Sequence, residues 1–174
     1  LLGNDYAVTW ALGHLVQLAL PEAYGCVGFH REHLPILPHP FVLVPKQIPE
    51  DKKGYRSDPM ALKQLKIIDS LFKKCSSIIV ATDAGREGEL IFRYIYEYLH
   101  CQKPFQRLWI SSLTEKGIKT GLANLQEGSA FDLLYASAQK RSEADWLVGI
   151  NATQALSIAV GEGIYSLGRC KHLP

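Results

Sequence analysis

A short apolar run that ends in an acidic, glycine-containing turn constrains the fold of this chain more than any other feature. Residues 77–82 suit a strand buried in a parallel sheet, and Asp83 follows directly. Helical patterns lie on both sides, over residues 59–74 and 87–100, and a second short strand pattern covers residues 107–110. Strands that alternate with helices are typical of an α/β sheet, so we predict an α/β fold with a mostly parallel sheet flanked by helices.

The amino-terminal third has a less regular pattern. Residues 6–12 are rich in β-branched and aromatic side chains, which predicts a strand. Seven of the nine prolines lie between Pro21 and Pro59, and this density excludes a long helix. We expect an extended segment there, with an edge strand at residues 41–44 and an exposed turn at residues 50–54.

The sequence also marks helix starts and a domain boundary. Asp58 can cap a helix whose first residue is Pro59, and Thr114 can cap the helix that follows it. Residues 131–158 contain no proline and much alanine, which predicts one long helix. We place the boundary at the connector before it, and so divide the chain into an α/β domain, residues 1–126, and the start of a helical domain, residues 127–174.

Composition narrows the function only slightly. The 19 Lys and Arg residues nearly balance the 17 Asp and Glu residues, so a nucleic-acid role must rest on local arrangement. The four cysteines form no Cys-x-x-Cys pair, so we expect neither a zinc site nor a disulfide framework. No segment approaches the ~18 apolar residues of a membrane span, and no signal segment is evident. We infer a cytoplasmic protein with reduced cysteines and no membrane partner.

The acidic turn after residues 77–82 has the composition of a metal site. Asp83, Glu87 and Glu89 follow the strand, where α/β folds gather their functional groups. Carboxylate oxygens suit Mg²⁺, and Arg86 between them can hold a phosphate. The alternative is that these acids only stabilise the amino end of the next helix. The residues alone leave both interpretations open, and the number of acids together with Arg86 favours the metal site.

Several motifs resemble one enzyme family. The order Asp83-x-x-Arg86-Glu87-Gly88-Glu89 after an apolar strand resembles the Toprim motif of topoisomerases and primases. The longer run over residues 81–92 is similar to the type IA DNA topoisomerases, and within them to the bacterial topoisomerase III group. Further segments resemble the same family in the same order: residues 8–15, 34–38, 107–114 and 144–153. The resemblance implies a Toprim-like fold followed by a helical DNA-binding domain.

This resemblance implies roles for residues of the acidic turn. In the family the Toprim acids bind Mg²⁺ near the scissile phosphate, which makes Asp83 and Glu87 the expected metal ligands. Glu87, Arg86 and His14 are the expected catalytic residues, and a structural role is the alternative for His14. Many relatives carry a second Asp where this chain has Gly85, which leaves one carboxylate fewer. A further family glutamate belongs to a first strand that we expect upstream of this chain.

The nucleophile of the family is not matched here. The resemblance implies a tyrosine that joins covalently to a 5′ phosphate, so that resealing the strand needs no ATP. None of the eight tyrosines matches it, and Tyr94, Tyr96 and Tyr98 are interpreted as packing residues of one helix. We therefore expect an amino-terminal fragment that holds the metal-binding half of the active site and does not relax DNA by itself.

The predicted long helix carries candidate DNA contacts. Arg141 and Asp145 are four residues apart and share a helix face. The resemblance places them beside bound single-stranded or negatively supercoiled DNA, and an ordinary surface ion pair is the alternative. Lys140 and Arg169 are further candidates for phosphate binding. Trp146 could stack on a base, but packing inside the protein is the favoured interpretation.

Two other functions remain open. One is a different Toprim enzyme, such as a primase or nuclease, against which residues 144–153 and the Gly168-Arg169 pair argue. The other is a non-catalytic module that binds DNA or metal, for which the near-neutral charge predicts weak, salt-sensitive DNA binding.

A sheet without its first strand has an unpaired edge, which predicts dimerisation through that edge. The resemblance also implies a bacterial, nucleoid-associated location.

Overall fold

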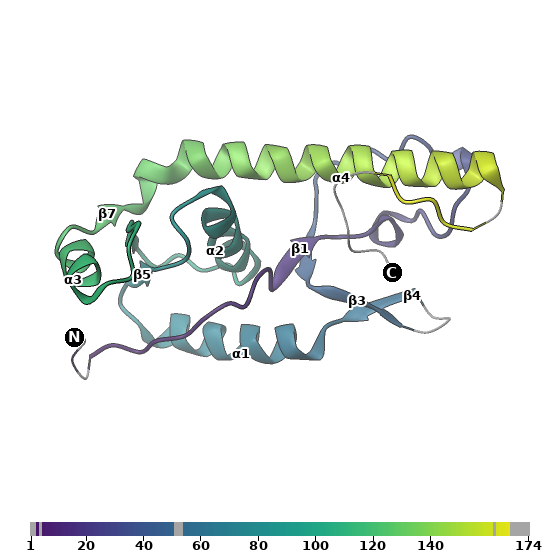
Figure 1. The fold of residues 1–174 in the computed structure, drawn as a ribbon. Helices are drawn as coiled ribbons and strands as arrows, with labels where there is room; N and C mark the ends of the chain where they lie inside the picture. The colour runs from purple at the N-terminus through teal and green to yellow at the C-terminus, as the bar shows by residue number, and fades with distance from the viewer. Residues whose placement is uncertain (1–2, 4, 51–53, 162, 168–174) are drawn as a thin grey trace. The chain divides into compact units, whose positions relative to one another are not determined.

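The computed structural model describes residues 3, 5–50, 54–161 and 163–167 (Figure 1). The α-helices are α1 (Pro59–Lys74), α2 (Arg86–Tyr98), α3 (Glu115–Ala123) and α4 (Asp132–Val160). The strands are β1 (Val16–Leu18), β2 (Leu43–Pro45), β3 (Gln47–Glu50), β4 (Gly54–Ser57), β5 (Ile78–Val80), β6 (Phe105–Arg107) and β7 (Gln126–Glu127). Short 3₁₀ helices are η1 (Pro21–Tyr24), η2 (Arg31–His33) and η3 (Gly128–Phe131). The predicted α/β fold with a helical carboxyl-terminal segment is confirmed.

The described residues form two compact units. The first contains those within residues 1–17 and 44–138, and the second contains those within residues 18–43 and 139–174. The first unit holds α1, α2, α3 and the sheet of β5, β6 and β7, whereas the second holds η1, η2 and most of α4. The domain division expected between residues 126 and 127 stays a prediction.

The sheet of the first unit brings two chain segments to one edge. β5 and β6 pair in parallel, with Val80 opposite Arg107, and α2 connects them. β7 pairs antiparallel on the other side of β6. Because the carboxyl ends of parallel neighbours lie together, the residues that follow β5 lie beside the end of β6. The acidic turn and Arg107 are therefore neighbours in space, although Asp83 and Arg107 are 24 positions apart in the sequence.

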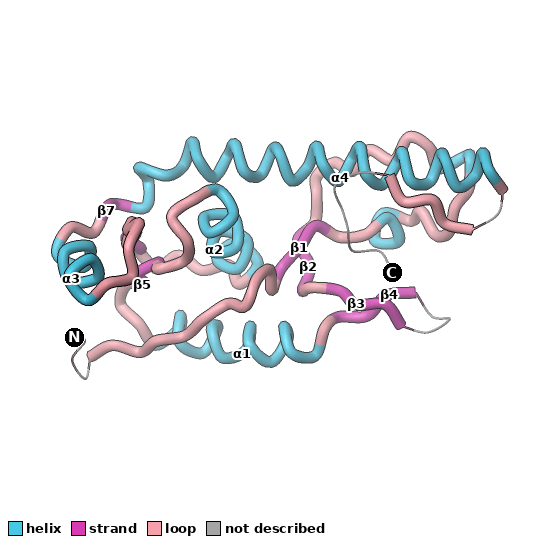
Figure 2. The backbone as a smooth tube through the Cα atoms, in the orientation of Figure 1, coloured by secondary structure: helices cyan, strands magenta, loops and turns pink. Residues whose placement is uncertain are grey.

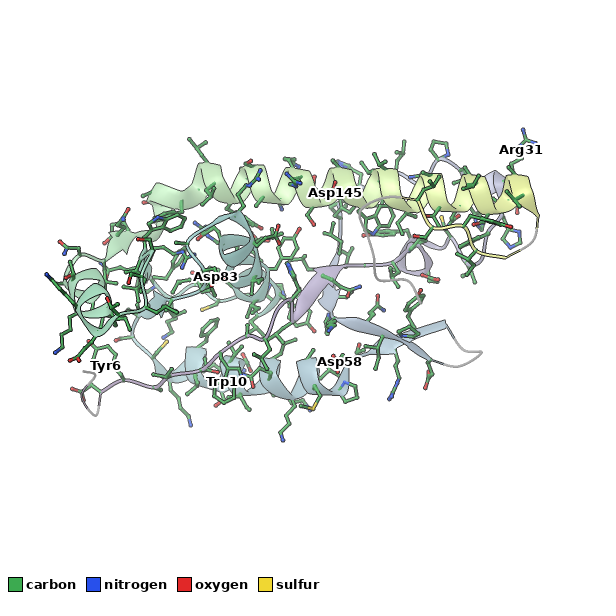
Figure 3. All side chains as sticks on the ribbon, viewed as in Figure 1. Tyr6, Trp10, Arg31, Asp58, Asp83 and Asp145 are labelled. Carbon is green, nitrogen blue, oxygen red and sulfur yellow. The ribbon has the colours of Figure 1, made fainter. Side chains whose placement is uncertain are left out.

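Two helix starts agree with the sequence. Asp58 accepts a hydrogen bond from the Met60 amide at 2.9 Å, and α1 then begins at Pro59, as Figure 3 shows near the Asp58 label. Thr114 accepts a hydrogen bond from the Gly117 amide at 3.2 Å, and α3 follows. Each cap pairs an amide that the helix cannot pair itself, which explains why the helices begin there.

The apolar face of α1 packs into the core of the first unit. Ala61, Leu65 and Ile68 recur at helical spacing and are all buried. They share this core with Val80 of β5 and with apolar side chains of α2, namely Leu90, Phe92 and Ile95. A buried leucine or isoleucine contributes about 1.5–3 kcal/mol, so the burial of these side chains is a main source of the stability of this unit.

The strand expected at residues 6–12 is wrong. Those residues are loop (Figure 2), and β1 forms later, at Val16–Leu18. The Gln64 side-chain amide of α1 donates to the Thr9 hydroxyl at 3.0 Å and to the Trp10 carbonyl at 2.7 Å. A helix side chain thus occupies the Trp10 carbonyl, a backbone group that a neighbouring strand could otherwise pair. Apolar side chains of this segment are exposed, namely Tyr6, Val8, Trp10 and Leu12.

The proline-rich segment contains more strand than the sequence predicted. The edge strand expected at residues 41–44 is observed as β2, which begins two residues later, at Leu43. β3 and β4 form an antiparallel hairpin that was not expected. Pro49 pairs opposite Tyr55 in this hairpin. A two-stranded hairpin tolerates proline because one side of each strand needs no ladder hydrogen bond. Of the turn expected at residues 50–54, residues 51–53 lie outside the described residues.

The remaining strand and helix expectations hold with small shifts. β5 and α2 lie where the sequence placed them, and α4 confirms the long helix. The strand expected at residues 107–110 instead ends at Arg107. None of the helices in the described ranges combines the length and apolar character needed to span a bilayer.

Candidate functional site

The acidic loop, defined here as residues 83–87, connects β5 to the first turn of α2 (Figure 2). The side chains of Asp83, Arg86 and Glu87 are all exposed on it. Gly85 is the N-cap residue of α2, and no side chain caps this helix by a hydrogen bond. Asp83 therefore does not cap α2. This argues against the alternative that Asp83 serves to cap the next helix by a hydrogen bond.

A close approach of backbone to backbone shapes the acidic loop. A Cβ atom on Gly88 would lie 2.1 Å from the Asp83 carbonyl oxygen and 2.8 Å from the Asp83 nitrogen. Only glycine allows the first turn of α2 to lie this close to Asp83. The Thr82 hydroxyl also donates to the Gly88 carbonyl at 2.7 Å. The glycine and the threonine together fix the path by which the chain leaves β5 and enters α2.

A buried ion pair lies beneath the acidic loop. Glu89 and Arg107 both have 0% exposed surface, and Arg107 Nε donates to Glu89 Oε2 at 2.9 Å. Burial lowers the pKa of the Arg107 guanidinium, while the charge and hydrogen bond of Glu89 act to raise it. The sequence grouped Glu89 with the exposed acids, but its carboxylate is fully engaged inside the protein and is not available to a metal ion.

A second arginine shares the same carboxylate. Arg93 Nε donates to Glu89 Oε1 at 2.9 Å, and its Nη2 atom donates to the Gly128 carbonyl at 3.0 Å and to Asp132 Oδ1 at 2.6 Å. The sequence analysis assigned no role to Arg93 or to the Arg107 side chain. The one available signal was an arginine at the start of the short strand expected at residues 107–110, because a charged side chain in a buried strand requires a buried partner.

His14 and Glu87 meet although they are 73 positions apart. His14 Nε2 lies 3.3 Å from Glu87 Oε2, and the two side chains are 40% and 73% exposed. The structure thus brings together two of the catalytic residues that the sequence suggested. Arg86 has no ion-pair partner among the residues whose positions are described, so its guanidinium is available to an anion.

The candidate DNA contacts of α4 lie in the second unit. Arg141 Nε lies 3.8 Å from Asp145 Oδ2, with the two side chains 42% and 51% exposed. Lys140 Nζ lies 2.7 Å from Glu143 Oε2. Both cations are therefore at the surface, each beside one acid. Arg169 lies outside the described residues.

Trp146 packs within the second unit. Its ring is nearly perpendicular to those of Tyr24, at 6.0 Å, and Phe41, at 5.5 Å between centroids. Its Nε1 donates to the Ala19 carbonyl at 3.0 Å. These contacts favour a packing role for Trp146, because its ring has two aromatic neighbours and its one donor already has a protein partner.

The acidic loop offers two exposed carboxylates to a divalent ion. Among the described residues no group of three or more His, Cys, Asp or Glu side chains is arranged to hold a metal. Mg²⁺ commonly uses only one or two carboxylates and completes its shell with water and phosphate oxygens. Asp83 and Glu87 fit such a site, whereas the buried Glu89 does not.

Comparison with known proteins decides the family. The family model described as the Toprim domain matches residues 1–113, which include β5, the acidic loop, α2 and β6. The chain belongs to the Toprim domain family. Toprim domains generally bind a divalent metal ion, which agrees with the two exposed carboxylates of the acidic loop.

The Toprim domain is shared with curated bacterial topoisomerases. The chain is 51% identical over 158 residues to DNA topoisomerase 3 of Bacillus anthracis, and 48% identical over 157 residues to that of Bacillus subtilis. Each alignment covers 89% of this chain and 20% of the relative. The chain thus spans about a fifth of the length of these relatives. The resemblance to the topoisomerase III group is confirmed.

Proposed function

We propose that this Toprim chain is the amino-terminal part of a type IA DNA topoisomerase of the topoisomerase III group. The whole enzyme would cut one DNA strand, pass another through the gap and reseal it, with a tyrosine outside this chain as nucleophile. The observation that carries the proposal is the pair of exposed carboxylates, Asp83 and Glu87, at the carboxyl end of a Toprim strand.

We assign Asp83 and Glu87 as the ligands of one Mg²⁺ ion. When bound, the ion would offset negative charge on a phosphate of the cut strand. Arg86 would hold a phosphate oxygen by a charge-assisted hydrogen bond, which its exposure and its lack of an ion pair with described residues support. His14, 3.3 Å from Glu87, would orient that carboxylate.

We assign the helical segment, residues 127–174, to a groove for single-stranded DNA. Arg141 and Lys140 would bind phosphates, with Arg169 as a third cation, and Asp145 would orient Arg141. The exposed positions of Arg141 and Lys140 support this assignment. Negatively supercoiled DNA would supply the single-stranded region, in the cytoplasm and nucleoid of a bacterium.

Metal titration tests the proposed site. Mn²⁺, as a paramagnetic substitute for Mg²⁺, would be titrated into the 174-residue chain and followed by electron paramagnetic resonance. Asp83→Asn should weaken binding by about 10-fold or more, since even a partner outside the ligand set contributes about this much. Asp69→Asn is the matched control, because Asp69 pairs with Lys73 on α1. Equal Mn²⁺ binding by the wild type and Asp83→Asn would remove Asp83 from the site.

Plasmid relaxation tests the missing nucleophile. We expect the 174-residue chain to leave a negatively supercoiled plasmid unchanged in the presence of Mg²⁺, while a full-length DNA topoisomerase 3 relaxes it. Relaxation, or a covalent DNA adduct, with this chain alone would contradict the assignment of the tyrosine to another segment. Template-dependent primer synthesis or metal-dependent nicking would instead favour a primase or nuclease.

We also propose that the isolated chain dimerises. The exposed apolar side chains of residues 6–12 support this, since a second copy would cover them. Light scattering should give twice the chain mass of 19.4 kDa. A monomer at all concentrations tested would contradict dimerisation without affecting the assignment of the metal site.

A further inference from the structure

The Arg107 side chain holds the backbone that leads into the acidic loop. Its Nη1 atom donates to the Thr82 carbonyl at 2.7 Å and to the Val80 carbonyl at 3.1 Å. Its Nη2 atom donates to the Asp83 carbonyl at 2.7 Å. One planar group thus binds three carbonyl oxygens at the end of β5 while its Nε also binds Glu89, which makes four hydrogen bonds, one more than the three N–H donors of an ammonium group can form.

These hydrogen bonds hold the backbone of Asp83. Its carbonyl accepts from Arg107 Nη2 and also from the Gly85 amide at 2.9 Å, so both acceptor directions of that oxygen are used inside the protein. The carbonyl is held inside the protein and the Asp83 side chain is exposed; Figure 3 labels its position. The carboxylate is therefore presented by a backbone that is fixed before any ion binds.

Glu89 orients the arginine. Its Oε2 atom accepts from Arg107 Nε at 2.9 Å, and the Trp109 ring lies 5.2 Å from the guanidinium carbon. Because Glu89 belongs to the same helix as Glu87, the buried pair also connects the two ends of the acidic loop. Arg107 contacts the strand side through carbonyls, and Glu89 holds it against α2.

Arg93 provides the contrast. It shares Glu89 with Arg107, but its other hydrogen bonds go to Gly128 and Asp132 rather than to the acidic loop. Both arginines are therefore part of one buried network, and only Arg107 contacts the backbone that carries Asp83.

We propose that Arg107 is a positioning residue for the metal site, which holds the Asp83 backbone so that the carboxylates of Asp83 and Glu87 are preorganised for a divalent ion. The proposal rests on the proposed function of the acidic loop. It adds a role for a residue that touches neither the ion nor DNA.

The test compares Arg107→Lys with Arg93→Lys in the 174-residue chain. Each variant keeps its positive charge near Glu89, and only the first loses hydrogen bonds to the acidic loop. Mn²⁺ affinity would be measured by electron paramagnetic resonance, and stability by thermal unfolding. We expect Arg107→Lys to weaken Mn²⁺ binding by about 10- to 100-fold, the usual effect of removing a group that orients a ligand. Arg93→Lys should leave the affinity within about twofold, even where both variants unfold at a similar lowered temperature.

The outcomes separate a positioning role from a purely structural one. Equal losses of affinity in both variants, in proportion to their losses of stability, would overturn the proposal. Wild-type affinity in Arg107→Lys with weak binding in Asp83→Asn would also overturn it, while the proposed function stands. Wild-type affinity in Asp83→Asn would overturn the proposed function itself.

A second variant covers the case in which Arg107→Lys does not fold. Glu89→Gln keeps every donor of Arg107 but removes the negative charge and one of the two acceptor oxygens that Arg93 and Arg107 use, so Mn²⁺ affinity should fall by less than in Arg107→Lys but still measurably. Unchanged affinity in folded Glu89→Gln would overturn the proposal in that case. In Glu89→Gln, Mn²⁺-induced broadening of amide resonances should also extend to more residues outside the acidic loop than in the wild type. A loosened loop would allow the bound ion to occupy several positions.

Discussion

Glu89 and Arg107 form an ion pair at 2.9 Å, and neither residue has any exposed surface. Removing two charges from water is costly, and the pair repays this only when its hydrogen bonds are complete. Here they are: Glu89 accepts from both Arg93 and Arg107, and Arg107 also binds carbonyls of β5 and the acidic loop. The interior beneath the candidate metal site thus contains a buried ion pair whose hydrogen bonds are complete.

Glu89→Ala should destabilise the chain severely. It leaves Arg107 buried without a counter-charge, and breaking a buried pair in this way costs about 3–5 kcal/mol. Glu89→Gln should cost less, because its amide oxygen still accepts a hydrogen bond. Urea unfolding followed by circular dichroism measures both. Equal stability of Glu89→Ala and the wild type would mean that the pair is not buried as the structure has it.

Gly88→Ala should disturb the acidic loop without any change of charge. Its Cβ would lie 2.1 Å from the Asp83 carbonyl oxygen, and neither backbone segment can yield as a flexible side chain would. We expect a loss of roughly 1–3 kcal/mol in unfolding free energy, as for other overpacked sites. Mn²⁺ affinity should fall as well, because the Asp83 backbone must move.

Gly85→Ala is the matched control three residues away. A Cβ at Gly85 meets no atom within 4 Å, and its φ of 177° is open to any residue. Stability should therefore change by no more than about 1 kcal/mol in either direction. A larger loss in Gly85→Ala than in Gly88→Ala would contradict the close approach of α2 to Asp83.

The helices were predictable from the sequence, and the strands were less so. Asp58 and Thr114 mark helix starts through local hydrogen bonds, which depend only on neighbouring residues. Strand pairing depends on partners that are distant in sequence. Residues 6–12 have strand-like composition, yet the Gln64 side chain of α1 binds the Thr9 hydroxyl and the Trp10 carbonyl. No local pattern in residues 6–12 could have revealed this contact with α1.

Asp58→Ala tests the local part of that conclusion. Losing the side-chain acceptor for the Met60 amide should cost about 1 kcal/mol of unfolding free energy. Asp58→Asn should be close to neutral, because asparagine caps helices as well as aspartate does. Urea unfolding of the two variants separates the cap from the weak pair that Asp58 forms with Lys46 at 3.9 Å. An equal loss in both variants would assign the effect to charge rather than to capping.

The candidate site was predictable in its residues but not in their division of roles. The sequence placed Asp83, Glu87 and Glu89 together, and the motif resemblance named the first two as ligands. Burial separates them, since Glu89 is fully buried and the other two are exposed. The burial of the Glu89 carboxylate depends on its partners Arg93 and Arg107, and Arg107 comes from β6, which is distant in sequence.

Arg141→Ala should weaken binding of single-stranded DNA and make it less salt-dependent. Each phosphate contact on a single strand contributes about 0.7 to the slope of log affinity against log salt, so removing one cation at the DNA should lower the slope by about that amount. Arg141 is suited to such a contact because Asp145 holds it only loosely, at 3.8 Å. Fluorescence anisotropy with a labelled oligo(dT), repeated over a salt series, measures both quantities.

Lys119→Ala separates a local contact from bulk charge. Lys119 is an exposed cation of α3 that pairs with Glu115 at 2.6 Å, and its loss changes the net charge by the same amount as Arg141→Ala. If Arg141 contacts phosphate, only its variant should change the salt slope. If the chain attracts DNA through overall charge alone, both variants should lower affinity equally with little change of slope. The near-neutral net charge of +2 makes the second result the less expected one, because so small a charge provides little long-range attraction.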